Sequence, residues 1–184
     1  MISTMMNTPL GVKTLHRFGA RHFSTSRVGD YDGQQIHWRS YAEIDAGSAR
    51  LANALTRLGI VPGDRVGTFM WNSTQHLETY LAVPSLGAVL HTLNCRLSAE
   101  HIAYIINHAA DRFLILDARL IDSFFRVLPL IPDVEHVIVS GAHNDAAAAL
   151  NDPRAVSYES LLRDAELTFP WPEPEENAAA GICY

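Results

Sequence analysis

Short apolar segments alternate with amphipathic segments along this chain, and this alternation restricts the fold more than any other feature of the sequence. The apolar segments are nearly continuous, as in strands that are buried on both faces; they comprise residues 66–70, 88–90, 113–116 and 137–139. The segments between them carry apolar side chains at helical spacing, so we expect strand–helix–strand units with right-handed crossovers. The sequence therefore predicts an α/β fold with a doubly wound, mostly parallel sheet.

Serine residues mark the beginnings of three expected helices. Ser40-Tyr41-Ala42-Glu43 has the spacing of a capping box, in which the Ser hydroxyl and the Glu carboxylate satisfy each other's exposed N–H groups. Ser73 and Ser98 can each cap a further helix. Pro84 falls late in the helix after Ser73 and is expected to kink or end it.

Weaker local patterns complete the expected secondary structure. Asp32-Gly33 is a turn signal and predicts a small N-terminal hairpin between residues 27–28 and 35–38. Two more helices are expected, one marked by Leu120, Phe124, Phe125 and Leu128 and a short one over Tyr158–Asp164. Residues 146–149 are interpreted as a surface excursion.

Changes in composition divide the chain into three parts. Residues 1–30 form an N-terminal arm and first helix, residues 31–168 an α/β subdomain, and residues 169–184 a connector rich in Pro and Glu followed by a closing strand. Prolines at alternate positions of the connector hold it extended and stiff. The closing strand, Gly181-Ile182-Cys183-Tyr184, is expected to be buried, which makes the Cys183 thiol inert packing.

The first 29 residues allow two interpretations. They contain no acidic residue, four basic residues and many Ser or Thr, which suits a mitochondrial presequence. The alternative is a folded helix followed by a strand. A cytoplasmic location is our first expectation and a mitochondrial one the alternative.

Charge and cysteine content exclude several classes of function. The formal net charge of −6 argues against a nucleic-acid partner, which requires a basic surface. Two cysteines without paired spacing fit neither a zinc ribbon nor a disulfide scaffold and indicate a reducing compartment. No apolar run approaches the roughly 20 residues of a transmembrane helix.

The sequence has few local motifs that indicate catalysis or phosphate binding. The turn Gly59-x-x-x-Gly63-Asp64 precedes a strand, so its amides lie at the wrong end of the sheet for phosphate, and the sequence has neither G-x-G-x-x-G nor a Walker loop. Asp117 follows an expected strand and is interpreted as the start of a turn rather than a ribose ligand.

The nine histidines do not indicate a metal site. His101 and His108 lie seven residues apart on one expected helix, about 10 Å along its axis, so they cannot share an ion through that helix alone. His16 and His22 have no nearby carboxylate in the sequence. We expect no metal ligands in this chain.

Two longer blocks carry a family resemblance. Residues 58–66, LGIVPGDRV, and residues 78–97, ETYLAVPSLGAVLHTLNCRL, together with the opening Ser40-Tyr41-Ala42-Glu43, resemble the N-terminal domain of AMP-forming acyl-CoA synthetases of the adenylate-forming superfamily. The medium- and long-chain fatty-acid–CoA ligases are the most similar branch. The resemblance covers essentially the whole chain.

The resemblance implies that the chain is the N-terminal portion of such a ligase. In that family a strand ending in Tyr or Phe leads into a Thr/Ser/Gly-rich phosphate loop, so Tyr184 would be the first residue of the ATP-phosphate loop. The full-length parent would use ATP, Mg²⁺ and CoA with a fatty acid. The only lysine, Lys13, lies too far from the expected loop in the sequence to replace the family's catalytic lysine. We expect residues 1–184 alone to bind none of these cofactors and to be inactive.

A second interpretation treats the chain as a non-catalytic α/β module for dimerisation or partner binding. The resemblance also allows a homodimer formed through the N-terminal arm. Met5, Met6, Leu10 and Val12 would supply apolar contacts in that arm.

Overall fold

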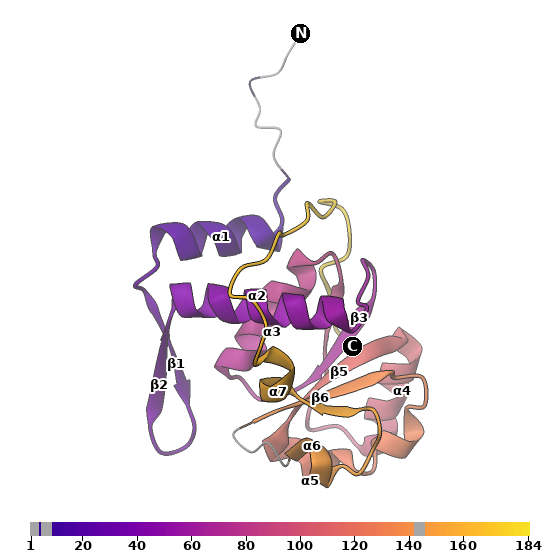
Figure 1. The fold of residues 1–184 in the computed structure, drawn as a ribbon. Helices are drawn as coiled ribbons and strands as arrows, with labels where there is room; N and C mark the ends of the chain where they lie inside the picture. The colour runs from indigo at the N-terminus through magenta and orange to yellow at the C-terminus, as the bar shows by residue number, and fades with distance from the viewer. Residues whose placement is uncertain (1–3, 5–8, 142–145) are drawn as a thin grey trace.

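A parallel sheet with helices on both faces forms the centre of the protein (Figure 1). The structure, a computed structural model, describes residue 4 and residues 9–141 and 146–184. Its sheet consists of β3 (Arg65–Phe69), β4 (Val89–Thr92), β5 (Asp111–Asp117), β6 (His136–Ser140), β7 (Ala155–Ser157) and β8 (Gly181–Ile182). These strands lie in the order β7-β6-β5-β3-β4-β8, and every neighbouring pair is parallel.

A separate antiparallel hairpin precedes the sheet. It consists of β1 (Arg27–Tyr31) and β2 (Ile36–Ser40) and lies between the helices α1 (Val12–His22) and α2 (Tyr41–Arg57). The carboxylate of Asp32 accepts hydrogen bonds from the amides of Gln34 and Gln35, at 2.8 and 2.9 Å, and so closes the predicted Asp-Gly turn. The predicted fold class is confirmed by the parallel sheet and this hairpin.

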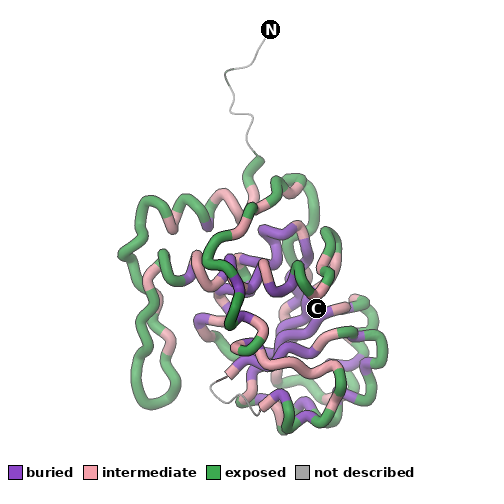
Figure 2. The backbone as a smooth tube through the Cα atoms, in the orientation of Figure 1, coloured by how far each residue is buried: buried purple, intermediate pink, exposed green. Residues whose placement is uncertain are grey.

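Helices cover the sheet in two layers with separate cores. The remaining helical segments are α3 (Thr74–Ser85), α4 (Ala99–Ala109), α5 (Ile121–Phe124), α6 (Ala146–Ala149) and α7 (Tyr158–Leu162), with short 3-10 turns η1 (Ala118–Leu120) and η2 (Leu128–Leu130). One core joins α2, α3 and α7 to one face of the sheet, and the other joins α4, α5 and α6 to the opposite face. Figure 2 shows the purple, buried backbone concentrated in the strands and the inner helices.

The alternation of side chains along β5 explains why the apolar strands are nearly continuous in sequence. Phe113 and Ile115 point into the core with α2 and α3, whereas Leu114 and Leu116 point into the core with α4 and α5. All four side chains are fully buried. Since both faces of the strand are covered, six of its seven residues are buried, and only Arg112 near its start is partly exposed.

The three predicted N-caps are confirmed. The Glu43 carboxylate accepts a hydrogen bond from the Ser40 amide at 2.7 Å, and the Ser40 hydroxyl accepts one from the Glu43 amide at 3.2 Å, which completes the capping box. Ser73 and Ser98 cap α3 and α4 in the same way, through the amides of His76 and His101. The helix α3 ends one residue after Pro84, as the sequence predicts.

The helix expected around Leu120–Leu128 is wrong as a single element. The segment is divided into η1, α5 and η2, and Phe125, expected on its buried face, is 43% exposed. Pro129 lies within η2 and cannot donate a helical hydrogen bond. The guanidinium of Arg154 instead satisfies the carbonyls of Leu128 and Ile131, at 3.1 and 2.6 Å, and holds the broken segment in place.

Two smaller differences concern the end of the sheet. The strand β7 is absent from the sequence-based prediction, because a segment of three residues carries too little periodicity to be detected. Residues 146–149 form the short helix α6, whose Ala147 is buried against the core, rather than a surface excursion alone.

Helix α1 connects the N-terminal region to the connector near the other end of the chain. It packs on α2 and α3, and the Lys13 ammonium donates to the carbonyl of Pro172 at 3.0 Å and forms an ion pair with Glu173. His16 lies on the buried side of α1, with its ring 5.8 Å from that of Trp171. Figure 1 shows the yellow connector beside the start of α1.

The expectation that His16 has no carboxylate nearby is wrong. Its Nε2 atom lies 3.0 Å from Asp45 Oδ1, and Arg17 contacts the other oxygen of the same carboxylate at 2.8 Å. Asp45 belongs to α2, so only the packing of α1 across α2 brings these groups together. Among the described residues, no helix is both long and apolar enough to cross a lipid bilayer.

A buried carboxyl group links three helices of one layer. Glu78 of α3 is 6% exposed and accepts a hydrogen bond of 2.8 Å from the hydroxyl of Tyr158 on α7. Its carboxyl group lies against the backbone of α2 at Gly47, where a Cβ atom would collide with it. Burial raises the pKa of Glu78 to about 7, against the opposing effects of the Tyr158 hydrogen bond and of Arg39 and Arg50.

We expect Glu78 to make folding stability depend on pH. Because its pKa is near 7 in the folded protein and 4.5 as the ordinary value, the unfolded chain loses the proton first and the free energy of unfolding falls as pH rises from about 4.5 to 7. The contribution is about 3 kcal/mol, from the 1.36 kcal/mol that one pKa unit represents. Urea unfolding at several pH values should show this slope in the wild type and lose most of it in Glu78→Gln, which cannot ionise. Equal slopes in the two proteins would contradict the assignment.

Candidate functional site

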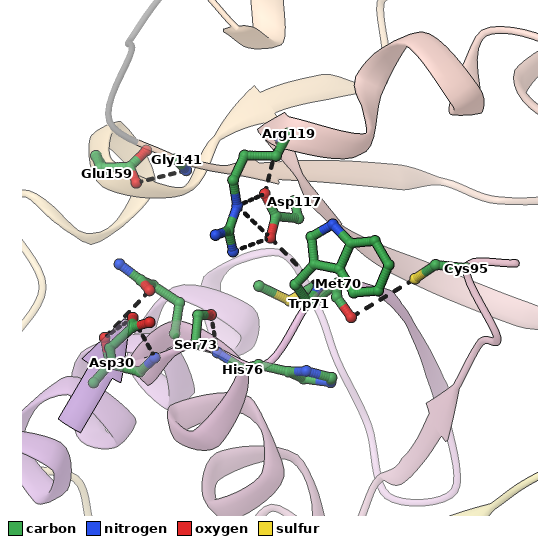
Figure 3. A network of polar contacts seen from close by, with 12 residues as sticks. Asp30, Met70, Trp71, Ser73, His76, Cys95, Asp117, Arg119, Gly141 and Glu159 are labelled. Carbon is green, nitrogen blue, oxygen red and sulfur yellow. Dashed lines mark hydrogen bonds and ion pairs between the residues drawn. The ribbon is translucent and has the colours of Figure 1, made fainter. Parts of the chain in front are cut away.

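The carboxyl edge of the sheet is where an open parallel α/β sheet places its ligands. A cleft of 660 Å³ lies there, between the β1–β2 hairpin and the ends of β3, β5 and β6. Its polar lining comes from several elements: Asp30, Asp32, His37, Arg39, Ser73, Thr74, Gln75, Asp117, Arg119 and Ser140. Figure 3 shows how part of this polar network is arranged.

The N-terminus of α3 at this edge already holds a carboxylate. Asp30 of the hairpin accepts hydrogen bonds from the amide and the hydroxyl of Thr74, at 3.0 and 3.1 Å. A carboxylate is favoured there by the positive end of the helix dipole. The contact fixes the hairpin to the start of α3, and the negative charge of Asp30 disfavours a phosphate at the same helix end.

Asp117 is also occupied by the protein itself. Its carboxylate accepts hydrogen bonds from the amide and the side chain of Arg119, at 2.9 Å and 2.7 Å, and from the amide of Trp71 at 3.4 Å. The residue caps η1, so the expectation that Asp117 starts a turn is confirmed. The Asp117 hydrogen bond raises the pKa of the Arg119 guanidinium, which stays charged.

Tyr184 follows β8 and makes two specific side-chain contacts. Its hydroxyl lies 2.5 Å from Nδ1 of His108, in the last turn of α4. Its ring centroid is 5.3 Å from that of His91 on β4, with 48° between the ring planes. The side chain is therefore anchored, although the residue as a whole is 54% exposed.

The ring of His91 is held by a buried carboxylate. Its Nδ1 atom lies 2.7 Å from Asp111 Oδ2, and both side chains are fully buried. His91 belongs to β4 and Asp111 to β5, so the pair spans the intervening strand β3. It can do so because the residue of β3 beside His91 is Gly67, where a Cβ would lie 2.7 Å from the Asp111 carboxylate.

The electrostatics of this pair follow from its burial. Removal from water raises the pKa of Asp111, and the hydrogen bond from His91 opposes that shift. Nε2 of His91 is buried and has no hydrogen-bond partner among the described residues. The pair is therefore joined through Nδ1 alone, and Nε2 makes no hydrogen bond within the part of the chain that the structure describes.

Sequence reasoning missed the His91–Asp111 pair and misplaced Cys183. A glycine inside an apolar strand indicates close approach of another group, so Gly67 was the available signal for the pair. Cys183 is exposed rather than buried, because β8 ends at Ile182 and lies at an edge of the sheet. Within the described ranges, no group of three or more His, Cys, Asp or Glu side chains could hold a metal ion.

Comparison with families of known proteins gives a match over most of the chain. The family described as AMP-binding enzyme matches residues 18–184. The long-chain-fatty-acid–CoA ligase of Thermus thermophilus is 40% identical over 187 residues, covering 99% of this chain and 32% of that protein. The 3-methylmercaptopropionyl-CoA ligase of Ruegeria lacuscaerulensis is 36% identical, and the medium-chain-fatty-acid–CoA ligase of Ectopseudomonas oleovorans 34% identical, over 185 residues that cover 100% of this chain and 34% of either protein.

Solved structures show the same fold. An anthranilate–CoA ligase in complex with anthranoyl-AMP superimposes with a TM-score of 0.82 at 15% identity, over 98% of this chain and 33% of that chain. A coronafacic acid ligase from Pectobacterium brasiliense gives a TM-score of 0.79 at 21% identity, over 95% and 33%. The chain thus spans about a third of the length of the proteins it matches.

We expect Gly67→Ala to destabilise the protein. The new methyl group would lie 2.7 Å from Asp111 Oδ2 and 2.9 Å from Leu114 Cδ1, and overpacking of this kind costs about 1–3 kcal/mol. Gly19→Ala is the matched control: its Cβ would meet Tyr41 at an ordinary 3.6 Å, and alanine should add about 0.5–1 kcal/mol within helix α1. Urea unfolding of both variants checks the prediction, which fails if Gly67→Ala is as stable as the wild type.

Proposed function

The chain belongs to the family of AMP-binding enzymes, and we propose that it is the N-terminal third of an ATP-dependent fatty-acid–CoA ligase. The observation that carries this proposal is the match of the whole chain to about a third of the medium- and long-chain fatty-acid–CoA ligases. We also propose that this portion has three parts: an N-terminal arm with the first helix (1–30), an α/β subdomain (31–168), and a connector with the closing strand (169–184).

The proposed reaction has two steps. The carboxylate of a fatty acid attacks the α-phosphorus of ATP, which forms an acyl-adenylate and releases pyrophosphate. The thiol of CoA then attacks the acyl carbonyl, loses its proton and displaces AMP, which leaves the thioester. Negative charge develops on phosphoryl oxygens in the first step and requires Mg²⁺, a cationic side chain and aligned N–H donors.

Tyr184 is proposed as the first residue of the ATP-phosphate loop. The closing strand β8 pairs with β4 in parallel register, so the chain leaves it at the carboxyl edge, where such a loop belongs. The polar groups already present at that edge are bonded within the chain: Asp30 and Ser73 occupy the N-terminus of α3, and Asp117 is bound to Arg119. These occupied groups favour a phosphate site built from residues beyond Tyr184.

Residues 1–184 alone are proposed to be inactive. The sequence contains no glycine-rich phosphate loop, and its only lysine, Lys13, is bound to the connector through Pro172 and Glu173. A cytoplasmic location remains our expectation. The packing of α1 on α2 and α3 favours a structural role for residues 12–22 over a mitochondrial targeting role.

The non-catalytic module remains a second candidate because apolar side chains are exposed in the N-terminal region. Large apolar side chains are exposed on α1 and on the hairpin: Leu15, Phe18, Tyr31, Ile36 and Trp38. Leu10 is exposed as well, whereas Met5 and Met6 lie outside the described residues. Exposed apolar side chains of this kind favour contact with a second copy of the chain, and a homodimer through the N-terminal region is proposed on this ground.

Isothermal titration of the 184-residue chain with ATP–Mg²⁺ should show no saturable binding. The physical reason is that the backbone amides that would hold the triphosphate are not among its residues. Saturable binding in the micromolar range, or labelled acyl-adenylate formed by purified protein of this length, would show that this chain is itself an active enzyme.

The DNA that follows the codon for Tyr184 provides the positive test. We expect it to encode a Thr/Ser/Gly-rich run ending in Pro-Lys-Gly, and the polypeptide extended through that region to the length of the ligases should form acyl-CoA from ATP, CoA and a fatty acid. If that DNA lacks such a run in every frame, the non-catalytic module is favoured instead.

A further inference from the structure

Two histidines hold Tyr184 from two sides. We propose that His91 and His108 are positioning residues for the ATP-phosphate loop, which they orient through the side chain of Tyr184. This inference rests on the proposed function, because it assumes that the backbone following Tyr184 binds the phosphates. It assigns a role to the two histidines and to the Asp111–Gly67 contact that supports one of them.

The contact with His108 is made from the last turn of α4, which has further contacts of its own. The ring of His108 stacks on that of Tyr104 one turn earlier, at 5.6 Å and 24°. The end of the helix is held by Arg65, whose guanidinium donates to the carbonyls of Ala109 and Ala110 at 2.7 and 2.8 Å. The Tyr184 hydroxyl therefore meets a hydrogen-bond partner whose position is fixed by the fold.

The contact with His91 is made from inside the sheet. Asp111 fixes the imidazole through Nδ1, and Gly67 gives the pair room to cross β3. Because both side chains are fully buried, the face that the imidazole presents to the Tyr184 ring has little freedom to move. The two histidines thus act on different parts of Tyr184, one on its hydroxyl and one on its ring.

The closing strand needs such anchors because it is short. Only two residue pairs join β8 to β4, and the following Cys183 is exposed. Groups that bind a transition state must be held to within about 0.5 Å of their productive positions. A two-residue edge strand cannot supply that precision through its backbone alone, whereas a pinned side chain at its end can.

The experiment measures steady-state kinetics of the extended ligase with ATP as the varied substrate. His108→Ala and Tyr184→Phe remove the two partners of the same hydrogen bond. Each should raise the KM for ATP about threefold to tenfold, the equivalent of one hydrogen bond. The KM for the fatty acid should not change. The double variant should be no worse than either single variant, because both remove one interaction.

Controls separate positioning from folding. His101→Ala on the same helix should leave all constants unchanged, and His108→Asn, which keeps an acceptor near the position of Nδ1, should restore the KM for ATP. A merely structural effect would lower kcat through a smaller active fraction and leave the KM for ATP unaltered. That result, or additive effects in the double variant, would overturn the proposal.

A second measurement does not depend on catalysis. In the 184-residue chain, nuclear Overhauser contacts should join the Tyr184 ring to the rings of His91 and His108. Absence of these contacts would overturn the positioning role. If the extended wild type forms no acyl-CoA while the contacts are present, the proposed function fails instead, so the two failures are distinguishable.

Discussion

The pairing of β3 with β4 on one side and β5 on the other is the constraint on which the rest of the structure depends. The chain leaves β4, crosses over β3 by way of α4 and returns as β5, so the strand order reverses around β3. With one crossover helix on each face, both sides of the central strands become buried. The two cores, the carboxyl edge and the position of β8 all follow from this arrangement.

Two buried carboxyl groups show how the same packing accommodates charge. Asp111 lies over Gly67 in the sheet, and Glu78 lies against Gly47 of α2. In either case the missing side chain of a glycine makes the space, and a histidine or a tyrosine supplies the hydrogen bond. Burial raises the pKa of both carboxyl groups, which is the expected cost of placing an acid where water cannot reach it.

The polar groups at the carboxyl edge indicate which residues of the proposed ligase have a structural role and which would bind substrate. Asp30 binds Thr74, and Asp117 binds Arg119. Away from this edge, Lys13 binds the connector at Pro172. Their role is to fix the hairpin, the turn after β5 and the connector. This part of the chain would then position the residues that act on a substrate, and those residues would lie elsewhere in the ligase. Tyr184 would connect the two parts.

The sequence by itself determined the elements whose signals are local. The caps at Ser40, Ser73 and Ser98 and the apolar strands depend on neighbours within a few residues, so they could be predicted. The family resemblance was likewise carried by continuous blocks of sequence. By contrast, the broken helix around Pro129 depends on Arg154, which lies more than twenty residues away.

Only the tertiary structure decided the contacts that bring distant residues together. The His16–Asp45 contact, the His91–Asp111 pair and the Tyr184–His108 hydrogen bond each join separate elements. Their formation depends on strand register and helix packing, which no local pattern encodes. The physical reason is that periodicity reports which face of an element is buried, whereas the partner on that face is chosen by the arrangement of the whole chain.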